Sequence, residues 1–169
     1  AGIELPTGHR VLTDHACTGA RVVVQLDEPS LPAVLAGAIP TPSGYGTVPA
    51  VPEPEAQDAL RGVVESLEVP VVVHCCATEP PVRLLARIGA AAIGIDATLP
   101  SVTGDPPNTA ILDALGEVWD AGTPLMLGLV PALEPTEQPT LRELAQRAFD
   151  LGDRLGFDRE RLGALVIPT

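Results

Sequence analysis

Short apolar runs alternate with longer amphipathic segments through most of this chain. The apolar runs are nearly continuous and rich in Val, Ile and Leu, which is typical of parallel strands that are buried on both faces. The predicted strands are Arg21 to Asp27, Val69 to Cys76, Ala91 to Asp96, Pro124 to Val130, and Gly163 to Thr169.

The segments between these runs have the length and the period of helices. They are Glu53 to Leu67, Pro80 to Ile88, Thr109 to Ala121, and Thr140 to Leu155. Asn108 precedes the third segment as an N-cap, and Thr140 with Glu143 has the pattern of a capping box at the start of the fourth. Gly89 and Gly122 follow two of the segments and are expected to end them. The predicted order is therefore βαβαβαβαβ.

This order predicts an α/β fold, either a doubly wound sheet or part of a barrel of parallel strands. No Gly-x-Gly-x-x-Gly motif follows the first predicted strand. A complete TIM-type (β/α)8 barrel takes about 250 residues, whereas this chain has 169. The strands would thus form the C-terminal half of such a barrel, as a single domain over residues 21–169. The remainder of the barrel would come from missing sequence or from another chain.

Two regions do not follow the alternation. Residues 1–20 are predicted to be an N-terminal loop segment that is discontinuous with the rest, because no crossover separates them from the first strand. This segment contains His15 and Cys17, a His-x-Cys pair that is the weaker of two metal candidates. Ala36 to Pro52 is a long loop rich in Pro and Gly, in which Tyr45 either covers a ligand or is an ordinary loop aromatic.

Charge and composition narrow the classes of function. The formal net charge is −12, and all ten basic residues are Arg, which argues against a nucleic-acid partner. The absence of Lys excludes enzymes that form an imine on a Lys side chain, and it excludes a Gly-Lys-Ser/Thr phosphate loop. No apolar run is long enough to span a membrane, and three cysteines, two of them adjacent, do not suggest a disulfide framework. We therefore expect a cytoplasmic protein.

Polar side chains lie at or just after the carboxyl ends of four of the five predicted strands. These are Asp27 and Glu28 on the first strand, His74 with Cys75 and Cys76 on the second, Asp96 on the third and Thr169 on the fifth. Because the carboxyl ends of parallel strands form the ligand site of α/β proteins, these groups are expected to face one site. An acidic residue there could receive a cationic group of a substrate, although Asp27 and Glu28 could also simply begin a solvated loop.

The second strand also carries two soft metal ligands. His74 and Cys76 are two residues apart, so an extended strand places their side chains on one face and that of Cys75 on the other. Cys76 is therefore the candidate ligand and Cys75 a candidate core residue. With Asp96 as a third ligand, the set would suit zinc, although buried His and Cys often only fill space.

Three of these segments resemble motifs of cobalamin-independent methionine synthases. Val-Gln-Leu-Asp-Glu-Pro-Ser-Leu at 24–31 resembles the family's Gln-x-Asp-Glu-Pro-Ala-Leu, and the His74–Cys76 segment resembles its His-x-Cys zinc pair. Ile-Gly-Ile-Asp at 93–96 matches the family's Ile-x-Ile-Glu, with Asp in place of the zinc-binding Glu. The resemblance implies the catalytic C-terminal barrel domain of that family, which is also related to uroporphyrinogen decarboxylases.

The resemblance implies an activity and roles for individual residues. Zinc, held by His74, Cys76 and Asp96, would bind homocysteine or a related thiol as thiolate, and the sulfur would take a methyl group from a folate. Asp27, with Glu28 beside it, would bind the amino group of the substrate. The expected partners are therefore a small-molecule thiol and a methyl donor, within methionine biosynthesis.

Two departures from the family pattern leave other functions open. The family's last zinc ligand is a Cys after the eighth strand, beyond Thr169, and no His follows the strand at 124–130 where the family has one. A uroporphyrinogen-decarboxylase-like enzyme and a corrinoid-linked methyltransferase are alternatives on the same barrel. A further alternative is a non-catalytic homologue that binds a partner through its open sheet edges.

Overall fold

The chain forms one parallel β-sheet with its strands in sequence order. The computed structural model describes residues 22–130 and 139–168. The sheet has five strands in the order β1-β2-β3-β4-β5, and every neighbouring pair is parallel. A doubly wound sheet would reverse its strand order at a switch point, whereas consecutive strands of a (β/α)8 barrel follow one another in this way. The predicted fold class, an α/β chain forming part of a TIM-type barrel, is confirmed.

All five predicted strands are present, each within its predicted run. They are β1 (Val24–Asp27), β2 (Val71–Cys75), β3 (Ala92–Asp96), β4 (Leu125–Gly128) and β5 (Val166–Pro168). The last begins later than predicted because helix α8 (Arg159–Leu165) occupies the preceding residues. Asp158 caps this helix, since its side chain accepts a hydrogen bond of 2.8 Å from the backbone N–H of Arg161.

The four predicted helices are also confirmed. They are α3 (Glu53–Ser66), α4 (Val82–Leu85), α6 (Thr109–Asp120) and α7 (Leu141–Leu155). Two further short helices, α2 (Leu31–Leu35) and α5 (Pro100–Thr103), were not predicted, and neither was α8. These helices have only four to seven residues, too few to show a clear hydrophobic period.

Local capping groups explain where the longer helices begin and end. The Asn108 side chain accepts from the N–H of Ala110 at 3.1 Å at the start of α6. Thr140 and Glu143 form the predicted capping box of α7. Gly89 and Gly122 each have φ of +83°, a left-handed conformation that glycine adopts without steric cost.

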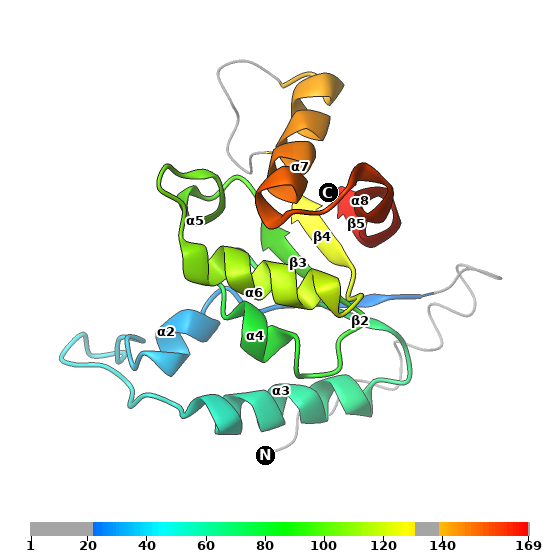
Figure 1. Ribbon diagram of the computed structural model, residues 1–169. Helices are drawn as coiled ribbons and strands as arrows, with labels where there is room; N and C mark the ends of the chain where they lie inside the picture. Colours follow the sequence, from blue (N-terminus) through cyan, green and yellow to red (C-terminus); the bar gives the residue numbers. More distant parts are fainter. Residues whose placement is uncertain (1–21, 131–138, 169) are drawn as a thin grey trace.

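The main core lies between the sheet and the helices, which Figure 1 shows lying in front of the strands. Alternate strand residues point into this core and are at most 2% exposed; they are Val71, Val73, Cys75, Ile93, Ile95, Leu125 and Leu127. Trp119 of α6 is fully buried, and its ring lies 4.9 Å from that of Phe157. Burial of these large apolar side chains is the main source of stability.

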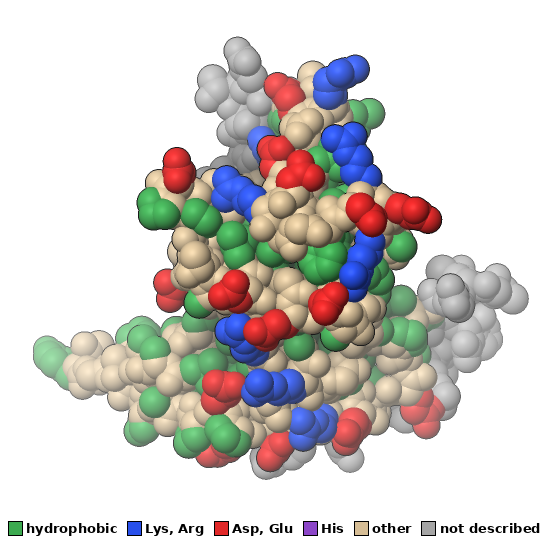
Figure 2. Space-filling model, in the orientation of Figure 1, with side chains coloured by type: hydrophobic (Ala, Val, Ile, Leu, Met, Phe, Trp, Pro, Cys, Tyr) green, Lys and Arg blue, Asp and Glu red, His purple; other side chains and the backbone are tan. Residues whose placement is uncertain are grey.

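The helical side of the molecule is covered by mixed charges. Figure 2 shows Arg side chains next to Asp and Glu side chains over this face. Arg83 of α4 donates two hydrogen bonds of 2.8 Å to Glu117 of α6, and Arg161 pairs with Asp120 at 3.0 Å. None of the helices within residues 22–130 and 139–168 combines the length and hydropathy that crossing a bilayer requires.

Candidate active site

Three strands bring the predicted site residues to one edge of the sheet. Asp27 is the last residue of β1, His74 is the penultimate residue of β2, and Asp96 is the last residue of β3. Asp27 lies opposite His74 in the strand register, and His74 lies opposite Gly94. Because side chains alternate along a strand, these residues face away from the core that contains Cys75. His74, the one histidine that the structure describes, accordingly does not appear on the helical face in Figure 2.

His74 and Asp27 form a direct hydrogen bond. The distance from His74 Nδ1 to Asp27 Oδ1 is 2.8 Å, and the same oxygen accepts a bond of 2.8 Å from the Gln25 side-chain amide. The bond from Gln25, followed by that from His74, lowers the pKa of Asp27 below its usual value. An ionised Asp27 carboxylate can only accept hydrogen bonds, so this bond forms when the imidazole carries a proton on Nδ1.

A glycine on the neighbouring strand provides the space for the His74 ring. A Cβ atom at Gly94 would lie 3.1 Å from His74 Cδ2 and 3.3 Å from His74 Cβ. Those distances are shorter than ordinary contacts between carbon atoms. The imidazole is thus held between Asp27 on one side and the backbone of Gly94 on the other. Its side chain remains 31% exposed, and within the described residues Nε2 forms no hydrogen bond.

Glu28 follows Asp27 and is half-buried. Its backbone N–H donates to the carbonyl of His74 at 2.8 Å, which extends the pairing of β1 and β2 by one bond. Burial, and secondly the charge of Asp27, raise the pKa of the Glu28 carboxyl above its usual value. The two adjacent acids therefore have their pKa values shifted in opposite directions, which often marks a functional site.

The two adjacent cysteines lie in different environments. Cys75 is fully buried in the core, as predicted, and burial raises the pKa of its thiol. Cys76 follows the last residue of β2 and is exposed, and neither cysteine forms a disulfide. Cys76 therefore has the accessible sulfur that a ligand or a reactive group requires.

Asp96 accepts hydrogen bonds from the loop that follows it. One of its oxygens, Oδ1, accepts from the Thr98 backbone N–H at 2.8 Å and from the Thr98 hydroxyl at 2.6 Å. Asp96 lies two residues beyond Gly94, so it is a diagonal neighbour of His74 across β2 and β3. Among the residues that the structure describes, its second oxygen accepts no hydrogen bond.

The predicted zinc ligands are close in the topology but are not gathered around one point. In the part of the chain that the structure describes, no group of three or more His, Cys, Asp or Glu residues is placed to hold a metal ion. His74, Cys76 and Asp96 as zinc ligands, and Asp27 and Glu28 as substrate-binding residues, therefore stay predictions. As it stands, this arrangement does not fit a preformed three-ligand zinc site.

Other predicted residues do not join this site. His15, Cys17 and Thr169 lie outside the described residues, as does the N-terminal segment to which the first two belong. Tyr45 is 95% exposed in the loop between α2 and α3, so the structure gives it no contact with a ligand site.

Three residues that support the site were not predicted from the sequence. Gln25 binds Asp27, Gly94 makes room for His74, and Thr98 holds Asp96. Gln25 could have been found, since it lies two residues before Asp27 and thus on the same face of the strand. The role of Gly94 depends on the register of β2 and β3, which the sequence does not give.

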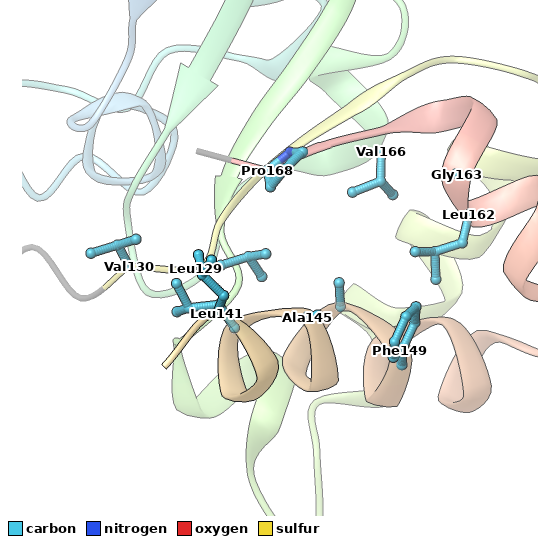
Figure 3. Close-up of a pocket in the computed structure, with 11 residues that line it drawn as sticks. Leu129, Val130, Leu141, Ala145, Phe149, Leu162, Gly163, Val166 and Pro168 are labelled. Atoms are coloured by element: carbon cyan, nitrogen blue, oxygen red, sulfur yellow. The ribbon is translucent and has the colours of Figure 1, made fainter. Parts of the chain in front are cut away.

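A separate cleft of about 430 Å³ lies where β4 and β5 meet helices α7 and α8. Figure 3 shows apolar side chains around it, among them Leu129, Phe149 and Val166. Its lining includes no ionisable side chain, so it offers shape and apolar surface but no acid–base or metal chemistry.

The fold and the strand-end groups define a class, a partial barrel of the TIM type with candidate chemistry at the carboxyl ends of its strands. No family model and no curated protein matches the chain. Among solved structures it is similar to a Xanthomonas albilineans dihydropteroate synthase with 4-aminobenzoic acid, at 18% identity and a TM-score of 0.49, over 88% of this chain and 60% of that one.

A second structure of the Xanthomonas albilineans enzyme, in complex with indole-2-carboxylic acid and 6-chloroguanine, is similar at 16% identity and a TM-score of 0.47. It covers 88% of this chain and 59% of that one, so the chain spans about three fifths of the length of these proteins. At these values the likeness identifies neither a family nor a substrate.

Proposed function

We propose that the chain is the catalytic part of a zinc-dependent thiol methyltransferase of the methionine-synthase type. The observation that carries the proposal is the His74 imidazole, which is held by Asp27 at 2.8 Å and whose Nε2 has no hydrogen-bond partner within residues 22–130 and 139–168. An accessible thiol, Cys76, comes directly after the end of the same strand, and a carboxylate, Asp96, ends the neighbouring one. Imidazole nitrogen, thiolate sulfur and carboxylate oxygen are the ligands that zinc prefers.

In this proposal His74 is already oriented, whereas Cys76 and Asp96 have to move. Cys76 lies beyond the end of β2, and Asp96 must share or give up its bonds to Thr98. The reaction transfers a methyl group: the acceptor thiol first loses its proton to solvent, and a new S–C bond then forms on its thiolate as the bond from methyl to the donor breaks. The electron pair of the broken bond stays with the donor, which takes up a proton from solvent. Glu28, whose carboxyl pKa is raised by burial, is the proposed partner for the substrate's amino group.

Zinc binding tests the proposal. The full chain, loaded with zinc and freed of excess metal, is expected to retain one equivalent, and His74→Ala and Cys76→Ser are expected to lose it. Cys75→Ala is the matched control, because that sulfur lies in the core and should not affect the metal. Metal-replete protein that holds no zinc, or that holds the same amount in all variants, would contradict the proposal.

A second candidate is a different enzyme on the same barrel, such as one resembling uroporphyrinogen decarboxylase or a corrinoid-linked methyltransferase. The specific observation that favours it is the missing three-ligand group among the described residues. A panel of thiol acceptors, assayed with a methyl donor in zinc and in chelator, separates the two candidates. Methylation of homocysteine that stops with chelator supports the first candidate, whereas a strong preference for another thiol, or no transfer to any thiol, supports the second.

A further inference from the structure

The His74 imidazole has two nitrogens, and its surroundings treat them differently. Nδ1 lies 2.8 Å from Asp27 Oδ1, while Nε2 has no hydrogen-bond partner among the described residues. Free histidine in water favours the other arrangement, with the proton on Nε2. The strand-end environment therefore has to select a tautomer that the isolated side chain does not prefer.

Two further contacts fix the geometry of this pair. The Gln25 amide donates to the same Asp27 oxygen at 2.8 Å, so the carboxylate is oriented from within its own strand. On the opposite side, the absence of a side chain at Gly94 lets the ring lie close to β3, where a Cβ would be 3.1 Å from Cδ2. These contacts come from three adjacent strands, which are more rigid supports than loops.

We infer that Asp27 is a positioning residue that keeps the His74 proton on Nδ1, so that Nε2 is the atom this site presents to its ligand. This inference deepens the proposed function, since it names the working atom of the same site. It also changes the role of Asp27, which the sequence resemblance assigned to substrate binding. Glu28 is then the carboxylate that remains for the substrate's cationic group.

Both candidate functions can use an Nε2 atom that carries a lone pair and no proton. A lone pair on Nε2 can bind zinc, and it can equally accept a proton from a substrate or a water molecule. With the proton on Nε2 instead, the accessible nitrogen could do neither until it was deprotonated. The tautomer thus decides whether the exposed side of the imidazole is an acceptor or a donor.

Two-dimensional ¹⁵N–¹H correlation spectra of the histidine side chains, recorded on the full metal-free chain, test this inference. The sequence has three histidines, so His74→Gln assigns the relevant signals by their loss. In the wild-type chain, at a pH where the ring is neutral, His74 is expected to show the pattern of the Nδ1–H tautomer. In Asp27→Ala that pattern should be lost, with a shift towards the Nε2–H tautomer.

Gln25→Ala is the matched control, because it removes the second hydrogen bond to Asp27 but leaves the acceptor of the His74 proton in place. It should keep the Nδ1–H pattern. Asp27 is 62% exposed, so its replacement is expected to leave the fold intact, and backbone amide spectra check this. A wild-type Nε2–H tautomer, or the same tautomer in wild type and Asp27→Ala, would overturn the inference. The readout needs no zinc, so a failure to bind metal would contradict the proposed function without affecting this result.

Discussion

At the residue scale, the candidate site consists of a few polar side chains that differ in how well neighbouring groups satisfy them with hydrogen bonds. Asp27 and His74 bind each other at 2.8 Å, and Asp96 is held by Thr98. Glu28 is the exception, because its carboxyl is half-buried and its pKa is raised by burial. A group kept in an unfavourable environment lowers stability and is expected to be retained for its function.

Glu28→Gln is expected to stabilise the protein at neutral pH. A raised folded-state pKa means that the proton binds more tightly to the folded chain, so this contribution to stability is present at low pH and is lost as pH rises through the folded-state pKa. Gln removes the charge that burial disfavours. Thermal unfolding should therefore show a higher midpoint for Glu28→Gln near neutral pH, and a smaller difference below pH ~4, where the acid is protonated in both states.

Glu79→Gln is the control for this prediction. Glu79 is an exposed carboxylate in the segment between β2 and α4, so its replacement should change the unfolding midpoint little at either pH. A Glu28→Gln chain that is less stable than wild type at neutral pH would show that favourable interactions of the half-buried carboxylate outweigh its cost of burial.

At the element scale, the sequence predicts those helix ends and strands that depend on residues close together in the chain. The capping box at Thr140 and Glu143, the Asn108 cap and the apolar strands are all properties of neighbouring residues, and the structure has them. The short helices α2 and α5 were missed because five or four residues carry too little pattern. The bond between Asp27 and His74 could not be predicted, since it depends on the register of strands 47 residues apart in sequence.

The capping box gives an element-scale prediction. Thr140→Ala is expected to destabilise the chain by about 1 kcal/mol, because it removes the acceptor for the Glu143 N–H at the start of α7. Urea unfolding measures this difference. The Glu143 carboxylate accepts hydrogen bonds from the Thr140 backbone N–H and from the Thr140 hydroxyl, and these bonds, the first most strongly, lower the pKa of Glu143. The stability that these bonds contribute is therefore present above the ordinary pKa of Glu and is lost as the pH falls through the lowered pKa of Glu143.

Thr47→Ala serves as the matched control. Thr47 is exposed in the loop that contains Tyr45, and within the described residues its hydroxyl forms no hydrogen bond. Its replacement should leave the urea midpoint nearly unchanged. Equal effects of the two substitutions would mean that the capping box does not contribute to global stability.

At the scale of the whole molecule, the sheet formed by the described residues ends in two edge strands, β1 and β5. A closed barrel has no edges, so an open series of strands leaves backbone groups and apolar surface without a partner. Apolar residues are exposed near one of these edges, with Ile167 at 47% and Leu141 at 85%. That the rest of a barrel covers this surface, from missing sequence or from another chain, stays a prediction.

The apolar cleft between β4, β5, α7 and α8 is expected to bind a hydrophobic fluorescent dye. It encloses about 430 Å³ and is lined almost entirely by apolar side chains, including the highly exposed Leu141. Leu141→Ser should therefore lower the dye fluorescence of the folded chain. Val48→Ser, at a residue that is 44% exposed and does not line the cleft, should not. An equal effect of both changes would place the dye elsewhere.

In the proposed function, His74 forms the core of a metal-binding site at the ends of β1 to β3. Zinc K-edge X-ray absorption of the zinc-loaded chain tests it most directly, because Zn–S distances of about 2.3 Å are resolved from Zn–N and Zn–O distances of about 2.0–2.2 Å. We predict one sulfur shell that is lost in Cys76→Ser, and imidazole scattering that is lost in His74→Ala. A zinc shell made only of oxygen, or one that is unchanged in both variants, would contradict the account.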